Sequence, residues 1–129
     1  PFNDLQDEDA SETFAALFRA LTPMSLAYLH VIRMASTGID NIALAQQHFK
    51  GALIVNDSYS PEEADQLLAD QGAAAVSFGR AFIANPDFVE RVAKGTPLSR
   101  MNGKTLYTPG PAGYIDYPTA EQASLLESE

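Results

Sequence analysis

The feature that most constrains this chain of 129 residues is an alternation of amphipathic helices with short apolar strands. Segments 52–56 and 73–78 carry apolar residues on both faces, which is typical of strands in a parallel sheet that is covered on both sides. The intervening helix has a strong start signal, because Ser60 is followed by Pro61 and by Glu63 three positions on. We therefore predict an α/β fold with helix 10–21, strand 25–33, helix 41–49, strand 52–56, helix 61–71, strand 73–78 and helix 86–94.

Polar residues at the starts of the other helices are predicted to cap them. Asp9 precedes the first helix and is followed three residues later by Glu12. Asp40 precedes the second helix, and Asn85 stands before the last one with Pro86 in the first helical position. These signals predict where each helix begins.

Three parallel strands are too few for a closed fold. Strands that are buried on both faces need neighbours at both edges, and an open edge favours unwanted pairing. Doubly wound sheets and (β/α)₈ barrels would both supply those neighbours, so we expect the chain to form part of a larger sheet. Residues 96–129 differ in carrying four prolines and three glycines, and they are predicted to form an extended tail that packs over the rest.

The composition argues against several classes of function. The net charge is −9, from 17 acidic and 8 basic residues, so we expect binding neither to nucleic acid nor to a membrane. There is no cysteine, and His30 and His48 lack the spacing of a metal site, so no metal is expected. The acidic start of the chain shows no secretory signal, and we expect a cytoplasmic protein.

Candidate functional residues lie where the strands end, because active sites of parallel α/β folds form at the carboxyl ends of their strands. Gly79 and Arg80 follow the third strand, where glycine allows close backbone approach and arginine suits phosphate oxygens. Residues 81–84 could add one helical turn that favours an anion. A surface arginine paired with an acid is the alternative for Arg80. Arg33 after the first strand is interpreted as a loop residue, with a place at the edge of the active site as the alternative.

Several motifs together resemble one known family. The stretch "AAVSFGRAFIANPDFVERVAKGTPL", followed by "TLYTPGPAGYIDYP", is similar to the C-terminal part of the Old Yellow Enzyme family. "AYLHVI" resembles the sixth barrel strand of these proteins, and the likeness runs from about Phe2 to Thr119. It implies that residues 1–95 form three β/α units, strands six to eight, of a (β/α)₈ TIM barrel, with residues 96–129 as its tail.

The resemblance also implies an activity. Family members are FMN-dependent ene-reductases, in which NAD(P)H reduces the flavin and the flavin passes a hydride to an activated alkene. Gly79 and Arg80 match the phosphate-binding pair on the eighth strand. Asn56, Asp57 and Ser58 match the tip of the seventh strand, where backbone N–H groups also face the phosphate.

The substrate side of the site is represented by Tyr107, which matches an aromatic residue that lines the pocket. Two positions depart from the family pattern. Leu106 replaces a frequent aromatic residue, and Asp57 stands where glycine is common, so its carboxylate is expected to point away from the phosphate. The flavin-ring contacts, the substrate-carbonyl donors and the proton-donating tyrosine belong to strands one to five, outside this chain.

The resemblance therefore predicts a chain that is inactive alone and that pairs with a complementary segment carrying strands one to five. Self-association into a homo-oligomer is the other way to cover the edges of the sheet. Two further functions stay open on the residues alone. The chain could belong to another phosphate-binding barrel enzyme such as an isomerase, or it could be a half-barrel assembly module without a cofactor.

Overall fold

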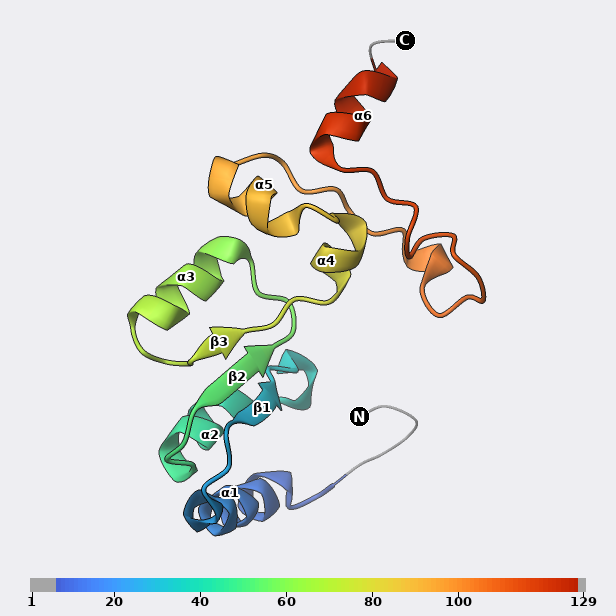
Figure 1. Ribbon diagram of the computed structural model, residues 1–129. Helices are drawn as coiled ribbons and strands as arrows, with labels where there is room; N and C mark the ends of the chain where they lie inside the picture. The colour runs from blue at the N-terminus through green and yellow to red at the C-terminus, as the bar shows by residue number, and fades with distance from the viewer. Residues whose placement is uncertain (1–6, 128–129) are drawn as a thin grey trace. The chain divides into compact units, whose positions relative to one another are not determined.

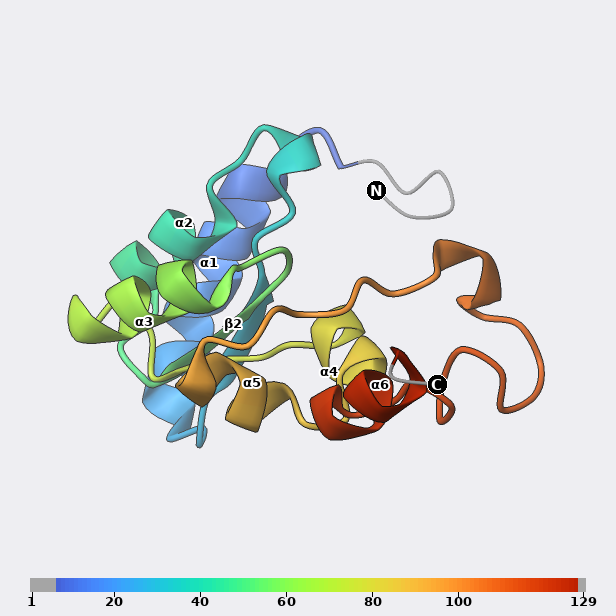
Figure 2. The ribbon, with the colours of Figure 1, turned by 90° about the horizontal axis from the view of Figure 1, so that it is seen from above.

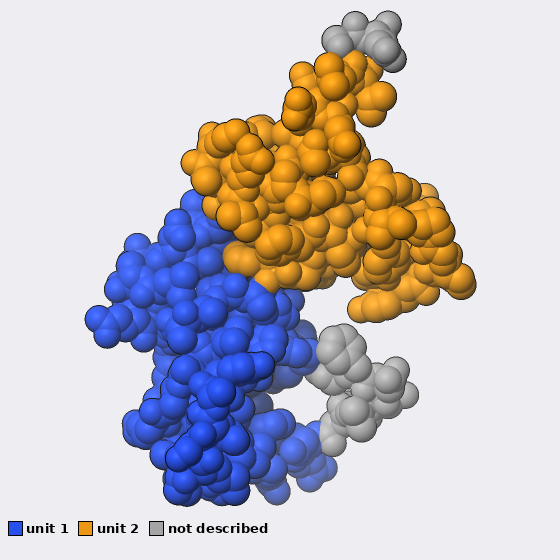
Figure 3. All heavy atoms as spheres, in the orientation of Figure 1, with its two compact units in different colours: residues 1–77 blue, residues 78–129 orange. Residues whose placement is uncertain are grey.

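The protein is described by a computed structural model over residues 7–127. The chain divides into two compact units, Pro1–Ser77 and Phe78–Glu129 (Figure 3). The division predicted between residues 95 and 96 stays a prediction.

The first unit is built on a parallel sheet of three strands in the order β1-β2-β3 (Figure 1). Leu29 of β1 pairs with Leu53 of β2, and Ile54 of β2 pairs with Ala75 of β3. The connections between the strands are helical, as the sequence predicted. The elements are α1 (Ala10–Leu21), β1 (Leu29–Ile32), α2 (Asn41–His48), β2 (Leu53–Asn56), α3 (Pro61–Ala69) and β3 (Ala75–Val76), with 3₁₀ turns at Thr22–Met24 and Ala35–Thr37.

The hydrophobic core lies between the sheet and its helices, which Figure 2 shows gathered on one side of the strands. Its buried members are Phe18, Val31, Ile42, Ala45, Phe49, Leu53 and Val55. The opposite face of the sheet is open within the described residues, since His30 is exposed and Ile32 is 45% exposed. Helices therefore cover one face of the sheet, as predicted, but the described residues do not cover the other face.

The strands are shorter than predicted. The expected strand 25–33 spans only Leu29–Ile32, and the expected strand 73–78 spans only Ala75–Val76. Pairing decides both lengths, because a residue belongs to the ladder only where the neighbouring strand offers its own backbone groups.

The helix starts were predicted well in this unit. Ser60 and Glu63 form a complete capping box, with Glu63 N–H donating to Ser60 Oγ at 3.1 Å and Ser60 N–H donating to Glu63 Oε2 at 2.8 Å. Asp40 caps α2 by accepting from Ala43 N–H at 2.9 Å. Asp9 precedes α1 as predicted, but its side chain makes no capping hydrogen bond.

The described residues of the second unit form three helices and a 3₁₀ turn: α4 (Arg80–Ala84), α5 (Phe88–Lys94), Gly103–Thr105 and α6 (Ala120–Glu127). The tail is therefore not extended throughout, because part of it forms α6. None of the helices in the described part of the chain has the length and apolar character needed to span a membrane.

The predicted cap at Asn85 is wrong. The residue before α5 is Asp87, and Asn85 instead follows α4 and is fully buried. Its amide is held by the tail, since it accepts from Ser99 N–H at 2.7 Å and donates to Ser99 O at 3.1 Å. It also donates to Ala81 O at 2.9 Å, so the side chain is turned away from the start of α5.

Candidate functional site

The carboxyl ends of the strands in the first unit are joined by side chains. Asn56 Nδ2 donates to Ser77 O at 2.8 Å and to Ser77 Oγ at 2.9 Å. His30 Nε2 lies 3.0 Å from the same Ser77 Oγ. Ser77, which follows β3, therefore contacts His30 of β1 and Asn56 of β2. These contacts link the three strands to one another.

The segment after β2 has an unusual backbone. Asp57 has φ +83° and Ser58 has φ +59°, both in the left-handed region that favours glycine. Ser58 Oγ donates to Asp57 Oδ1 at 2.9 Å, which is a local bond that supports the turn. The position where the family resemblance expects glycine thus has a backbone conformation that favours glycine, although aspartate occupies it.

Arg33, at the end of the neighbouring strand β1, holds this turn. Its Nε donates to Asp57 O at 3.1 Å and its Nη2 donates to Ser58 O. Its Nη1 lies 3.5 Å from Glu63 Oε1, and its guanidinium lies 4.0 Å from the centre of the Tyr59 ring. Burial raises the pKa of Tyr59, and the Arg33 charge opposes part of that shift.

Arg33 was interpreted as a loop residue that could also edge the active site, and its hydrogen bonds to the turn after β2 were not predicted. The only signal for them is topological. Because carboxyl ends of parallel strands lie at the same edge of a sheet, a long cationic side chain after one strand can reach the turn after the next.

Gly79 and Arg80 follow Phe78, the first residue of the second unit. Gly79 has φ −100°, which other residues adopt easily, and a Cβ atom built there would meet no atom of the described residues within 4 Å. Neither the backbone conformation nor the packing of the described residues therefore requires glycine at position 79. Open space beside a glycine, followed by the exposed cation of Arg80, fits the close approach of an anionic group from outside the chain.

The predicted turn after Gly79 is present as α4, and aromatic packing holds it. The rings of Phe78 and Phe82 lie 5.0 and 4.8 Å from the ring of Phe88 on α5. Ile83 N–H donates to Gly79 O at 3.0 Å. The backbone around Gly79 and Arg80 is thus fixed by apolar contacts within its own unit.

Tyr107 lies in the tail with 89% of its surface exposed and φ +63°. Its N–H donates to the Tyr114 hydroxyl at 2.8 Å, and Asn102 N–H donates to the Tyr117 hydroxyl at 2.7 Å. The hydroxyls of these two later tyrosines thus tie the tail to itself. This holds the Tyr107 backbone while leaving its side chain accessible.

The hydrogen bonds of Arg91 on α5 were likewise not predicted from the sequence. It is 4% exposed, and it donates to Asp87 Oδ1 at 2.7 Å, to Pro97 O at 3.0 Å and to Pro118 O at 3.1 Å. Ala120 N–H donates to Asp87 Oδ2 at 2.8 Å, and this bond, aided by Arg91, lowers the pKa of Asp87 against the opposing effect of burial. The tail is thereby attached to α5 at two places.

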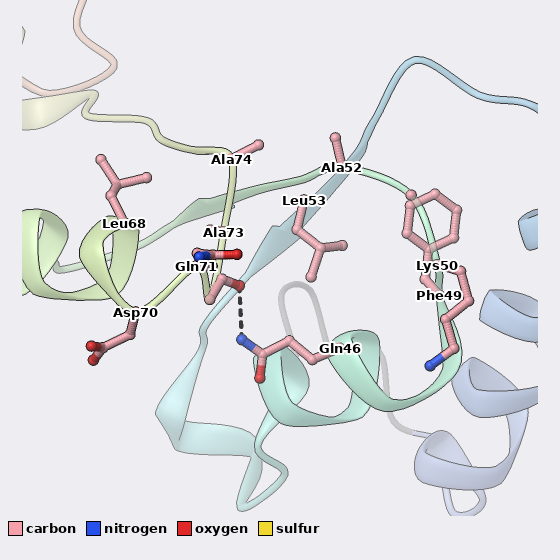
Figure 4. Close-up of a pocket in the computed structure, with 12 residues that line it drawn as sticks. Gln46, Phe49, Lys50, Ala52, Leu53, Leu68, Asp70, Gln71, Ala73 and Ala74 are labelled. Carbon is pink, nitrogen blue, oxygen red and sulfur yellow. Dashed lines mark hydrogen bonds between the residues drawn. The ribbon is translucent and has the colours of Figure 1, made fainter.

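A pocket of about 620 Å³ lies at the other end of the sheet, before β2 and β3 (Figure 4). Gln46 reaches across it from α2 and donates to Gly72 O at 2.7 Å. Its lining contains Lys50 and Asp70 but none of the predicted site residues. Because the amino ends of strands rarely carry the active site of such folds, the pocket is not the candidate site.

Histidine and acidic side chains do not gather in the described residues as a metal site would require, since no three of them come together. Within the first unit, Arg33 is the cationic group at the strand ends, where it donates to the backbone carbonyls of Asp57 and Ser58.

Comparison with known proteins identifies the family. A model of the NADH:flavin oxidoreductase / NADH oxidase family matches residues 6–99. A 12-oxophytodienoate reductase-like protein of Solanum lycopersicum is 33% identical over 125 residues, covering 96% of this chain and 35% of the relative. A probable flavin mononucleotide-dependent alkene reductase of Leishmania infantum is 36% identical over 121 residues, covering 91% of this chain and 33% of the relative.

Solved structures agree with this assignment. The old yellow enzyme from Trypanosoma cruzi matches with a TM-score of 0.81 and 40% identity, over 88% of this chain and 31% of that one. Morphinone reductase in complex with tetrahydroNAD matches with a TM-score of 0.78 and 36% identity, over 92% of this chain and 34% of that one.

The chain spans about a third of the length of the curated relatives it matches. Its α/β fold matches part of the TIM-barrel structures of Old Yellow Enzymes. The chain therefore belongs to the NADH:flavin oxidoreductase / NADH oxidase family, as a relative of the Old Yellow Enzymes.

Proposed function

We propose that this chain is the FMN-phosphate-binding part of an ene-reductase that oxidises NAD(P)H and reduces electron-poor alkenes such as enones. In this proposal β1, β2 and β3 are strands six, seven and eight of the barrel. The observation that carries it is Gly79, which neither its φ of −100° nor its neighbours within 4 Å require to be glycine. A ligand that approaches the backbone at this point explains the glycine, and Arg80 beside it suits a phosphate.

FMN would be held by two segments of this chain. Gly79 and Arg80 would contact the phosphate after β3, and Asn56, Asp57 and Ser58 would contact it after β2 through backbone N–H groups. When bound, FMN would supply the redox chemistry by accepting a hydride from NAD(P)H and passing it to the β-carbon of the alkene. The names of two relatives, an alkene reductase and a reductase solved with tetrahydroNAD, support this class of reaction.

Tyr107 would line the substrate pocket. Its exposed side chain on a fixed backbone suits a contact with a small molecule that is delivered by another part of the protein. The essential proton donor would lie in the segment that this chain does not contain.

The partner of this chain would be a complementary segment with strands one to five. Support comes from the one-third coverage of its relatives and from the open face of the sheet, where Ile32 is 45% exposed. Without that segment we expect no turnover, since phosphate contacts leave the isoalloxazine ring unbound. We also expect the assembled enzyme to be cytoplasmic, given the charge of −9 and the absence of cysteine.

The decisive experiment compares residues 1–129 alone with the same chain plus the complementary segment. Both samples receive FMN and NAD(P)H, and cyclohexenone reduction is followed together with the visible flavin spectrum. Turnover that appears only on mixing supports the proposal. Turnover by the lone chain, or a defined complex that binds no flavin, would contradict it, and the second result would favour an assembly module.

A further inference from the structure

We propose that Arg33 is a positioning residue for the FMN phosphate, acting through the turn after β2 and not through a direct contact. This inference rests on the proposed function. Arg33 donates from Nε to Asp57 O and from Nη2 to Ser58 O, so one guanidinium holds two successive peptide groups.

Because the trans peptide is planar, these two hydrogen bonds also fix the directions of the N–H groups that follow the two carbonyls. In such a peptide the carbonyl and the following N–H point in opposite directions. Because the carbonyls of Asp57 and Ser58 point towards Arg33, the N–H groups of Ser58 and Tyr59 point away from it. Two N–H groups that share one direction can donate together to the oxygens of an anion.

The turn needs such a hold because its conformation is unfavourable for its residues. Asp57 at φ +83° and Ser58 at φ +59° would relax towards negative φ if nothing held them. Glycines would adopt this backbone at little cost, but the chain has none at these two positions. The two hydrogen bonds from the Arg33 guanidinium therefore hold a backbone conformation that glycines would adopt without help.

Arg33 is itself held in place. Its guanidinium lies 4.0 Å from the centre of the Tyr59 ring, and Nη1 lies 3.5 Å from Glu63 Oε1. Glu63 is fixed in turn by the capping box at the start of α3. The donors of Arg33 are thus directed at the chain itself.

The test compares FMN with riboflavin, which lacks the phosphate, in the flavoprotein assembled from this chain and its complementary segment. Arg33→Met is expected to weaken FMN binding roughly tenfold, the equivalent of one to two lost hydrogen bonds, and to leave riboflavin binding unchanged. Arg33→Lys should lie between the two, because lysine donates without a planar fork. Arg19→Met is the control, since Arg19 is exposed on α1 near His48 and should alter neither affinity.

A rescue separates positioning from general damage. In the double variant Arg33→Met/Asp57→Gly, glycine adopts the left-handed backbone without help, so FMN affinity should recover in part. Amide hydrogen exchange of the flavin-free protein gives a readout without ligand, with faster exchange at Ser58 and Tyr59 expected in Arg33→Met. Glu63→Gln should have a smaller effect than Arg33→Met, because it keeps the cap and removes only an exposed ion pair, while Tyr59 and the two carbonyls still hold the guanidinium.

The outcomes are distinguishable. If the wild type prefers FMN to riboflavin and Arg33→Met keeps that preference, or loses both flavins equally, the positioning role is overturned while the proposed function stands. If the wild type binds FMN no better than riboflavin, the proposed function fails and this inference fails with it. Loss of FMN preference with recovery in the double variant supports the inference.

Discussion

Asn85 and Ser99 exchange two hydrogen bonds across 14 residues of chain, one in each direction. The buried amide of Asn85 thus pairs with the backbone N–H and carbonyl of Ser99, as a residue of a neighbouring strand would, although neither residue lies in a strand. The bonds attach the start of the tail to the end of α4.

The first prediction concerns this pair. Asn85→Ala is expected to destabilise the assembled protein by about 2–4 kcal/mol, because three partly buried hydrogen bonds to the backbone of Ala81 and Ser99 are lost. Urea denaturation measures the change. Asn102→Ala is the matched control, since Asn102 is an exposed cap and its loss should cost about 1 kcal/mol. Equal effects of the two substitutions would show that the Asn85 bonds add nothing.

The second prediction concerns Arg80. A charge-assisted hydrogen bond contributes about 1.5–3 kcal/mol, so Arg80→Ala should weaken FMN binding by roughly 10- to 150-fold. Riboflavin binding should not change, and the exposed Arg100→Ala should affect neither ligand. Flavin titration by fluorescence quenching measures both constants. Unchanged FMN affinity in the Arg80 variant would remove this residue from the phosphate site.

The third prediction concerns the left-handed backbone after β2. Asp57→Gly is expected to raise the free energy of unfolding by about 1 kcal/mol, because glycine adopts φ +83° without steric strain. Asp70→Gly is the control, since Asp70 has φ −79° and gains nothing from glycine there. Thermal unfolding of the assembled protein compares the two. A gain at position 70 as large as that at position 57 would speak against strain in the turn.

The fourth prediction concerns pH. The pKa of Asp87 is lowered in the folded protein, so its carboxylate stabilises the fold at pH values above the ordinary unfolded pKa of about 3.9. That contribution is lost as the pH falls from there through the lowered folded pKa. The Ala120 amide resonance, followed by NMR, should shift over this range as its bond to Asp87 is released. In Asp87→Asn the shift should vanish, and a shift that persists would assign it to another group.

The fifth prediction concerns Tyr107. Tyr107→Phe should alter alkene reduction modestly and leave flavin reduction by NAD(P)H largely intact, because the proposed proton donor lies elsewhere. The loop should keep its shape, since Tyr107 uses its backbone N–H to bond Tyr114. Stopped-flow measurement of the two half-reactions separates the effects. Complete loss of alkene reduction with substrate still bound would make Tyr107 the proton donor.

Most of the fold was predictable because its signals are local. Ser60, Pro61 and Glu63 fix the start of α3 through contacts within one turn, and the apolar runs fix β2. The family resemblance named the glycine-favouring position at Asp57, and the backbone there has φ +83°. The roles of the site residues in binding FMN stay predictions.

Two of the features that were not predicted depend on partners distant in sequence. Asn85-Pro86 has the local pattern of a cap, but Ser99, 14 residues later, decides the orientation of the Asn85 amide. Arg33 bonds carbonyls 24 and 25 residues away, and backbone acceptors leave no trace in the identity of their side chains. Such contacts become visible only once the chain is folded.

The two outer strands of the sheet each keep one edge unpaired. Within the described residues, β1 has four residues in its ladder and β3 has two, and each pairs on one side only. Because a residue joins a ladder only where a neighbouring strand offers its backbone groups, a strand that docks at either free edge can lengthen the strand it joins. Under the proposed function, we therefore expect β1 and β3 to be longer in the assembled enzyme than in this chain alone.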